Sequence, residues 1–177
     1  MELRIDTASP VRLRPFVPQD AAKVFRMSRE AGMQAWLPSQ VYRDEAHAAS
    51  VLAFLIERYA WPADPRIGPY VLGVALDRSP EVIGHVGFSP LDGAVEVGFA
   101  IEQGQQGKGC ATVAVRAACA WAMREFALPA VIAVTSERNL ASQGVLLRAG
   151  FARTDTREMS FQGLPQRVVL FELAGAR

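Results

Sequence analysis

The sequence contains little cysteine and little histidine, with two of each in 177 residues. Cys110 and Cys119 fall in one apolar stretch predicted to be helical. Nine residues of helix span about 13 Å, which exceeds the roughly 4.4–6.8 Å between the Cα atoms of a disulfide. Free thiols are therefore expected, as is usual in a reducing cytoplasm. His47 and His85 lie far apart and no Cys-x-x-Cys occurs, so no metal site is expected.

The sequence also has no excess of either charge and no long apolar run. Lys and Arg number 19 against 18 Asp and Glu, so neither nucleic acid nor a membrane surface is an expected partner. The richest apolar run, 111–123, contains Arg116 and is shorter than the roughly 20 residues of a transmembrane helix. The first 16 residues lack the apolar core of a signal peptide. A hydrophobic content of 50% excludes a disordered chain, and the length of 177 residues predicts one domain over residues 1–177.

Hydrophobic periodicity and turn residues predict an α/β fold. Strands are expected at 11–16, 70–76, 82–88, 94–101, 130–135, 151–161 and 166–173. Helices are expected at about 20–31, 44–59, 110–126 and 140–149, with irregular segments at 32–43 and 61–69. The three central strands form an antiparallel meander, and the strand–loop–helix–strand unit that follows implies a parallel pair within a mixed sheet.

The segment from Glu102 to Gly109 contains three glycines between a strand and a helix. The free N–H groups and the positive dipole of a helix start attract anions, and glycines let an anion approach the backbone. A P-loop is excluded because Gly109 follows Lys108 where Ser or Thr is required, and Thr112 replaces the third glycine of a dinucleotide fingerprint. The segment is either such an anion site or a plain strand–helix connection.

The motifs around this loop resemble those of the GNAT N-acetyltransferases, in particular the RimJ/RimL-type branch. The pattern Gln106-x-x-Gly109-x-Ala111 resembles the pyrophosphate loop of that family, and it follows the strand Glu-x-Gly-Phe-x-Ile at 96–101. The segments at 139–142 (Asn-Leu-Ala-Ser) and 147–151 (Leu-Arg-Ala-Gly-Phe) resemble the second half of the branch. The start at 11–16, with Asp20 and Ala21, resembles its opening. The resemblance implies a single-domain fold whose mixed, splayed sheet has about six or seven strands and about four helices.

The resemblance implies acetyl-CoA as the co-substrate and assigns residues to it. The loop that starts at Gln106 would hold the pyrophosphate through the backbone N–H groups of Gly107, Lys108, Gly109, Cys110 and Ala111. The backbones of Phe99 and Ile101 would pair with the pantetheine arm, which requires the strands at 94–101 and 130–135 to splay. Asn139 would hydrogen-bond the pantetheine; it could equally cap the helix that follows.

Catalytic roles also follow from the resemblance. The Phe99 N–H would polarise the thioester carbonyl, and Glu96 would accept the proton of the amine, unless it faces solvent and an ordered water does so. Leu146 stands where the wider family often has a tyrosine, which leaves Ser142 beside the sulfur as proton donor or as a small packing residue. Cys110 and His85 are interpreted as structural. Direct transfer in a ternary complex is expected, because no nucleophile has a partner base.

The expected reaction is acetylation of a primary amine, namely the N-terminal α-amine of a peptide or protein. A small amine such as an antibiotic or polyamine is an alternative acceptor, and a non-catalytic acyl-CoA-binding module is an alternative function. The acceptor side is expected at 32–43, 61–69 and 161–166, where Trp36 and Trp61 either contact the ligand or cap the core. These segments have no dense acidic patch, which favours peptides with small N-terminal residues over polycations.

Overall fold

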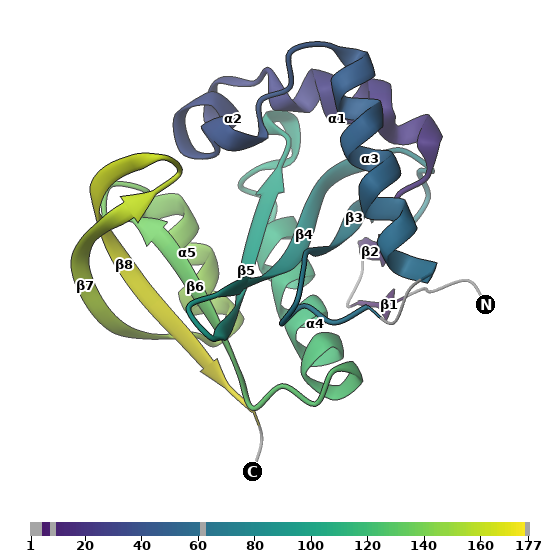
Figure 1. Ribbon diagram of the computed structural model, residues 1–177. Helices are drawn as coiled ribbons and strands as arrows, with labels where there is room; N and C mark the ends of the chain where they lie inside the picture. Colours follow the sequence, from purple (N-terminus) through teal and green to yellow (C-terminus); the bar gives the residue numbers. More distant parts are fainter. Residues whose placement is uncertain (1–4, 8–9, 61–62, 176–177) are drawn as a thin grey trace.

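The computed structural model describes residues 5–7, 10–60 and 63–175, which form one mixed β-sheet with helices on both faces (Figure 1). Within these residues the sheet has eight strands in the spatial order β1-β2-β3-β4-β5-β6-β8-β7. The strands are β1 (Ile5–Asp6), β2 (Val11–Arg14), β3 (Tyr70–Leu76), β4 (Val82–Leu91), β5 (Ala94–Ile101), β6 (Ala130–Ser136), β7 (Ala152–Phe161) and β8 (Leu164–Ala174). The predicted α/β fold with a mixed sheet is confirmed, and the additional strand is the two-residue β1.

Strands β3, β4 and β5 form the predicted antiparallel meander, and β2 extends it by pairing antiparallel with β3. Strand β4 is longer than predicted, because it continues through Pro90 to Leu91 before the turn at Asp92 and Gly93. Both turn residues have positive φ (48° and 81°), as an Asp-Gly hairpin turn requires. Proline has no backbone N–H to donate to a neighbouring strand. Pro90 is tolerated because β3 pairs with β4 only as far as Phe88, so no described strand lies on that side to accept a hydrogen bond.

Five α-helices are found in the described part of the chain, against about four predicted. They are α1 (Ala21–Ser28), α2 (Ala31–Trp36), α3 (Glu45–Ala60), α4 (Cys110–Glu125) and α5 (Leu140–Ala149), with 3-10 turns η1 (Pro18–Asp20), η2 (Pro38–Gln40) and η3 (Gln103–Gln105). The prediction of one helix over 20–31 and an irregular 32–43 is wrong. Helix α1 ends at Ser28, and α2 with η2 occupies the second segment. Helix α2 buries no residue, so it carries no hydrophobic periodicity to predict it.

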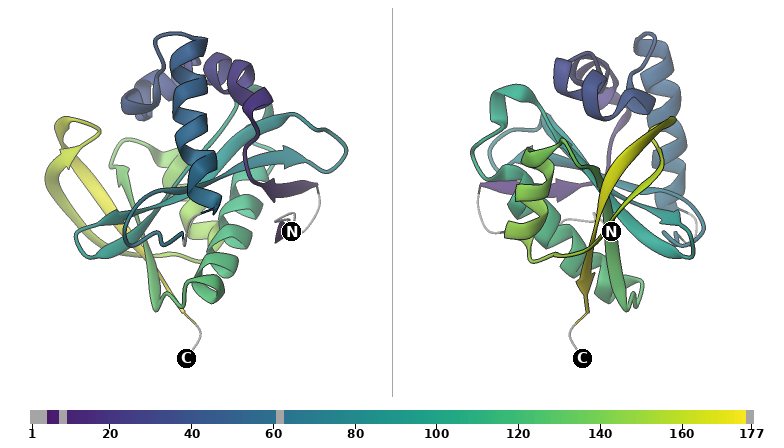
Figure 2. Two further views of the ribbon diagram at one scale, coloured as in Figure 1. Left: turned by 45° about the vertical axis from the view of Figure 1, so that its right-hand side comes forward. Right: turned by 90° about the vertical axis from the view of Figure 1, so that its left-hand side faces the viewer.

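The helices cover the two faces of the sheet unequally, as the turned views of Figure 2 show. Helices α4 and α5 pack on one face, where Ala114, Ala118 and Ala122 lie one helical turn apart and are at most 1% exposed. Their small side chains let α4 lie close to the strands. Helices α1 and α3 cover the other face over β3 and β4. Beyond them this second face is left open toward β5 and β6.

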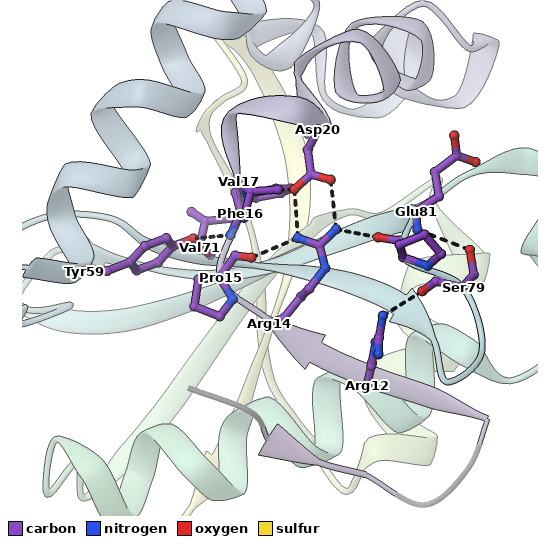
Figure 3. A network of polar contacts seen from close by, with 11 residues as sticks. Arg12, Arg14, Pro15, Phe16, Val17, Asp20, Tyr59, Val71, Ser79 and Glu81 are labelled. Atoms are coloured by element: carbon purple, nitrogen blue, oxygen red, sulfur yellow. Dashed lines mark hydrogen bonds and ion pairs between the residues drawn. The ribbon is translucent and has the colours of Figure 1, made fainter. Parts of the chain in front are cut away.

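A polar network fixes the chain segment that leads into α1 (Figure 3). The Arg14 guanidinium donates two hydrogen bonds of 2.8 Å to the Asp20 carboxylate, which is 6% exposed as a residue. The same carboxylate accepts the Val17 N–H at 2.9 Å. From α3, the Tyr59 hydroxyl accepts the Phe16 N–H at 3.1 Å and donates to a β3 carbonyl. The opening motif of the sequence therefore has a structural role, since it holds α1 and α3 over the sheet.

Candidate active site

Strands β5 and β6 are a parallel pair that diverges soon after the strands meet. Their backbones pair at one position, Glu96 opposite Ile132. The Glu102 N–H donates to a β4 carbonyl (2.8 Å), and alternate residues of a strand direct their backbone groups to opposite sides. The backbone groups of Phe99 and Ile101 therefore face away from β4, toward the opening between β5 and β6. This is the splay that the resemblance requires.

Glu96 lies at the point where this opening begins, on the sheet face that α1 and α3 cover. Burial raises the pKa of Glu96 to about 7, and a hydrogen bond from the Val134 backbone N–H offsets part of that effect. A carboxyl with this pKa is partly ionised at neutral pH, so it can accept a proton from a bound amine. The side chain is half-buried and lines the cavity described below.

Among the described residues, the glycine-rich loop leaves open space and unpaired N–H groups at the start of α4. Gly107 and Gly109 have φ values of +73° and +81°, and no atom lies within 4 Å of a Cβ built on either residue. The first helical hydrogen bond runs from the Val113 N–H to the Gly109 carbonyl (3.1 Å). The N–H groups of residues 110–112 therefore precede the first helical donor, Val113, and are available to a ligand.

Two side chains of this loop stabilise the loop itself. The Gln106 amide donates to the Ile101 carbonyl at 2.8 Å, which ties the loop to the end of β5. The Lys108 ammonium donates to the Gly104 carbonyl at 2.8 Å and to the Gln105 side chain at 3.1 Å. Both side chains therefore stabilise the loop. The Gln106 backbone N–H also donates within the loop, to the Gln103 carbonyl (3.3 Å).

On the other side of the opening, Asn139 precedes α5 and caps it. Its Oδ1 accepts the Ser142 N–H at 3.1 Å, so the capping interpretation of Asn139 is confirmed. The cap does not use the Nδ2 group, which hydrogen-bonds to no described residue. Leu146, where the wider family often has a tyrosine, is 1% exposed.

These elements surround one cavity of about 1100 Å³. The predicted site residues that line it are Glu96, Phe99, Ile101, Gln106, Gly107, Gly109, Cys110, Ala111, Asn139 and Ser142. Lys108 is the predicted residue that does not line the cavity. The structure thus brings together residues from β5, the loop, α4 and α5 that lie up to 46 positions apart in the sequence.

The sequence analysis assigned His85 a structural role, but His85 also lines this cavity. It lies on β4 opposite Ala100 of β5, on the same sheet face as Glu96. Burial lowers the pKa of His85 to about 4, so the imidazole is neutral at neutral pH. Glu96 and Ala100 share a face because an even number of positions separates them on β5, and His85 shares it because it lies opposite Ala100. The sequence alone does not give the β4–β5 register, so it could not show this.

Residues of all three predicted acceptor segments line the cavity, among them Trp36, Pro69 and Gln162. Trp36, on α2, lines the cavity and is 38% exposed. Trp61, the second tryptophan predicted here, lies outside the described residues. The Ser39 hydroxyl donates to the Gln162 side chain, which joins η2 to the turn between β7 and β8 across the cavity.

The described part of the chain contains neither a metal-ligating cluster nor a membrane-spanning helix. Over residues 5–7, 10–60 and 63–175, no group of three or more His, Cys, Asp or Glu side chains could hold a metal ion. No helix within those ranges has the length and hydropathy to span a membrane. Cys110 and Cys119 are both free and buried, as predicted.

Residues 11–152 match the family described as the acetyltransferase (GNAT) domain. This match spans most of the chain, so the protein belongs to the GNAT acetyltransferase family. It is an acetyl-CoA-dependent N-acetyltransferase. The family that the sequence motifs resemble is therefore confirmed.

Solved structures share this fold over nearly the whole chain. RimL, a ribosomal L7/L12 α-N-protein acetyltransferase solved in complex with coenzyme A, has a TM-score of 0.81 at 15% identity, covering 97% of this chain and 98% of that one. The ribosomal-protein-S5-alanine acetyltransferase of Vibrio fischeri has a TM-score of 0.79 at 20% identity, covering 98% and 97%. A GNAT-family acetyltransferase from Bacillus anthracis has a TM-score of 0.81 at 18% identity, covering 97% of this chain and 98% of that one. A search of curated protein sequences finds no match.

Proposed function

We propose that this enzyme transfers the acetyl group of acetyl-CoA directly to the N-terminal α-amine of a peptide or protein. The observation that carries the catalytic part is Glu96, a carboxyl whose pKa is raised to about 7 where β5 and β6 begin to separate. The RimL and S5-alanine acetyltransferase structures support the choice of acceptor, since both proteins are named for acetylating ribosomal proteins.

The residues around the opening fit coenzyme A. The space above Gly107 and Gly109 and the N–H groups at the start of α4 would receive the pyrophosphate. The backbone edge of Phe99, together with the Ile101 N–H, would pair with the pantetheine amides, and the Asn139 Nδ2 would donate to them from the other side. Bound in this way, acetyl-CoA supplies an activated thioester.

The protein's own groups would then perform three tasks. The Phe99 N–H would donate to the carbonyl oxygen, where negative charge develops. Glu96 would accept the proton that the amine loses as it attacks. The Ser142 hydroxyl, one helical turn from Asn139, would donate a hydrogen bond to the departing sulfur. A carboxylate with a pKa near 7 suits the base, because it is ionised at the pH at which the amine begins to be neutral.

Direct transfer is supported by the surroundings of the candidate nucleophiles. Within the described residues, no serine or cysteine that lines the cavity hydrogen-bonds to an imidazole or carboxylate base. Burial raises the pKa of Cys119 to about 12, which makes it a poor nucleophile. An acyl-enzyme intermediate therefore has no activated residue in the described site on which to form.

The charges around the cavity favour a peptide over a polycation. The acidic side chains that line it are Glu30 and Glu96. The Glu30 carboxylate accepts the Gln103 N–H at 2.8 Å, so part of its charge is already engaged. An aminoglycoside or polyamine carries several ammonium groups, and these would find few carboxylates to neutralise them.

The test is to measure kcat/KM for short peptides with free N-termini, spermidine and kanamycin, and to locate the acetyl group by mass spectrometry. The proposal predicts acetylation at the peptide α-amine and a kcat/KM that is higher for the peptides. A preference for the polycations of roughly tenfold or more would instead indicate a small-molecule acceptor.

A further inference from the structure

The cavity has a second part that coenzyme A does not explain. On the sheet face opposite α4 it extends beneath α1 and α3, between these helices and the β3–β4 part of the sheet. Its walls there are apolar: Val51 and Leu55 of α3 and Val71 of β3 are half-buried and line it. Behind them, Phe16, Val24 and Leu52 form a buried core cluster that supports these walls. A cavity lined by such side chains suits an apolar group.

The floor of this part is a strip of the sheet that almost lacks side chains. On β5, Gly98 and Ala100 follow Glu96 on the same face, and no atom lies within 4 Å of a Cβ built on Gly98. Gly87, on β4, lies opposite Gly98. The strip begins at Glu96 and ends at His85, which lies opposite Ala100. Four residues of extended strand separate Glu96 from Ala100, about 13 Å.

His85 is the polar group at the end of this apolar space. Its imidazole is half-buried, lines the cavity and has no hydrogen-bond partner among the described residues. A neutral imidazole has one N–H donor and one acceptor nitrogen. A polar side chain that faces a cavity and has no protein partner is suited to hydrogen-bond to a ligand.

We infer that this part of the cavity is the specificity pocket for the acceptor: it takes a bulky, uncharged apolar side chain carried by one of the first two residues of the acceptor, and His85 hydrogen-bonds to a neutral polar atom beside that side chain. The inference rests on the proposed function. It narrows the acceptor class to amines that have an apolar group close to the reacting nitrogen. His85 acts as a positioning residue, because it lies too far along the strand from Glu96 to reach the transferred proton.

The first experiment compares acceptors. The tripeptide amides Ala-Phe-Ala and Phe-Ala-Ala are compared with Ala-Ser-Ala and Ser-Ala-Ala by steady-state kinetics. Binding of the same peptides to the coenzyme A complex is measured by calorimetry, which does not depend on turnover. We expect at least one phenylalanine peptide to exceed its serine counterpart by roughly tenfold in kcat/KM and in affinity. Equal values for the serine and phenylalanine peptides in both measurements would overturn the inference.

The second experiment fills the pocket. Val51→Phe places a ring in the space, whereas Ala53→Phe adds the same ring on the exposed side of α3 and serves as the control. Val51→Phe should abolish the preference for the apolar peptide, and Ala53→Phe should retain it. Stabilisation by acetyl-CoA should be unchanged in both variants. If the preference is the same in the two variants, the apolar group binds elsewhere and the inference fails.

The third experiment isolates the hydrogen bond of His85. His85→Phe should raise KM for the preferred peptide roughly tenfold and leave kcat within about twofold, because a positioning contact acts on binding. His85→Gln, which restores a neutral donor and acceptor, should recover most of the affinity. An unchanged KM in His85→Phe would contradict the role of His85.

Small amines separate this inference from the proposed function. Phenethylamine and ethanolamine present the same reacting group with and without an apolar ring. If the enzyme acetylates phenethylamine faster but acetylates no peptide, the pocket is supported and the peptide acceptor is wrong. If peptides are acetylated without regard to apolar side chains, the proposed function stands and the pocket is wrong.

Discussion

The carboxylate of Glu96 on β5 accepts a hydrogen bond from the backbone N–H of Val134 on β6. Val134 lies two residues beyond Ile132, the β6 residue that pairs with Glu96. In a continuous parallel ladder this N–H would donate to a β5 carbonyl. Here it faces the Glu96 carboxylate, and no further β5–β6 backbone pair follows among the described residues. Glu96 thus marks the start of the opening and, in the proposed mechanism, is also the base.

Removing the charge of Glu96 should change the pH dependence of stability. The pKa of this carboxyl rises from 4.5 to about 7 on folding, so the folded protein binds the proton more tightly. The stabilisation from that proton is complete below pH 4.5 and is lost as the pH rises through 7. We expect Glu96→Gln to be more stable than the wild type at pH 8, by up to about 3 kcal/mol, with no difference near pH 4. Denaturant unfolding at both pH values measures this, and a pH-independent difference would contradict it.

A bulky side chain at Gly109 should block the pyrophosphate loop. In the wild type, acetyl-CoA at a hundredfold excess over Kd should stabilise the protein by about 2.7 kcal/mol. Gly109→Val should lose that stabilisation, because the Cβ branch would occupy the space above the loop. Gly104→Val in the same loop is the control, since Gly104 has no positive φ and does not line the cavity. If folded Gly109→Val gained as much from acetyl-CoA as the control, the loop assignment would be wrong.

Two substitutions at Asn139 separate its cap from its contact with the cofactor. Serine caps helices about as well as asparagine but has no amide N–H₂ group. Asn139→Ser should therefore keep the melting temperature and raise KM for acetyl-CoA several-fold, on the order of one lost hydrogen bond. Asn139→Ala should also lose about 1 kcal/mol of stability with the cap. An unchanged KM in Asn139→Ser would leave Asn139 as a cap alone.

Ser142 should act on the chemical step. Its hydroxyl makes no hydrogen bond to the described residues, so Ser142→Ala should change stability by less than about 0.5 kcal/mol. We expect kcat to fall on the order of 10²-fold, because the departing sulfur loses its donor. Single-turnover kinetics would separate this step from product release. A variant with full kcat would show that Ser142 is a small packing residue.

Much of the fold and of the cofactor side follows from local sequence signals. Strands β3 and β5 and helix α5 have the predicted bounds, because turn residues and Gly150 delimit them clearly. Gly150 has a φ of +103°, the left-handed conformation expected after a helix. The glycine-rich loop was recognisable for the same reason, since its chemistry depends on consecutive residues.

The acceptor side could not be predicted because it depends on contacts between distant segments. Helix α2 has six residues and buries none, so no periodicity indicated it. His85 follows Gly84 in an apolar strand, and nothing local distinguishes a core histidine from one that faces a cavity. Its role depends on the β4–β5 register and on the placement of α1 and α3. The Arg14–Asp20 contact fixes the segment that leads into α1, and both residues are far from His85 in the sequence.

The central claim, that Glu96 takes the proton of the acceptor amine, is tested most directly by the pH dependence of kcat at saturating peptide and acetyl-CoA. For the wild type we expect kcat to rise with pH through an inflection near the Glu96 pKa of about 7, because only the carboxylate accepts the proton. In Glu96→Gln, kcat should be on the order of 10²-fold lower and that inflection should vanish, while Kd for coenzyme A is unchanged. A Glu96→Gln enzyme that keeps both the wild-type kcat and its inflection would contradict the account.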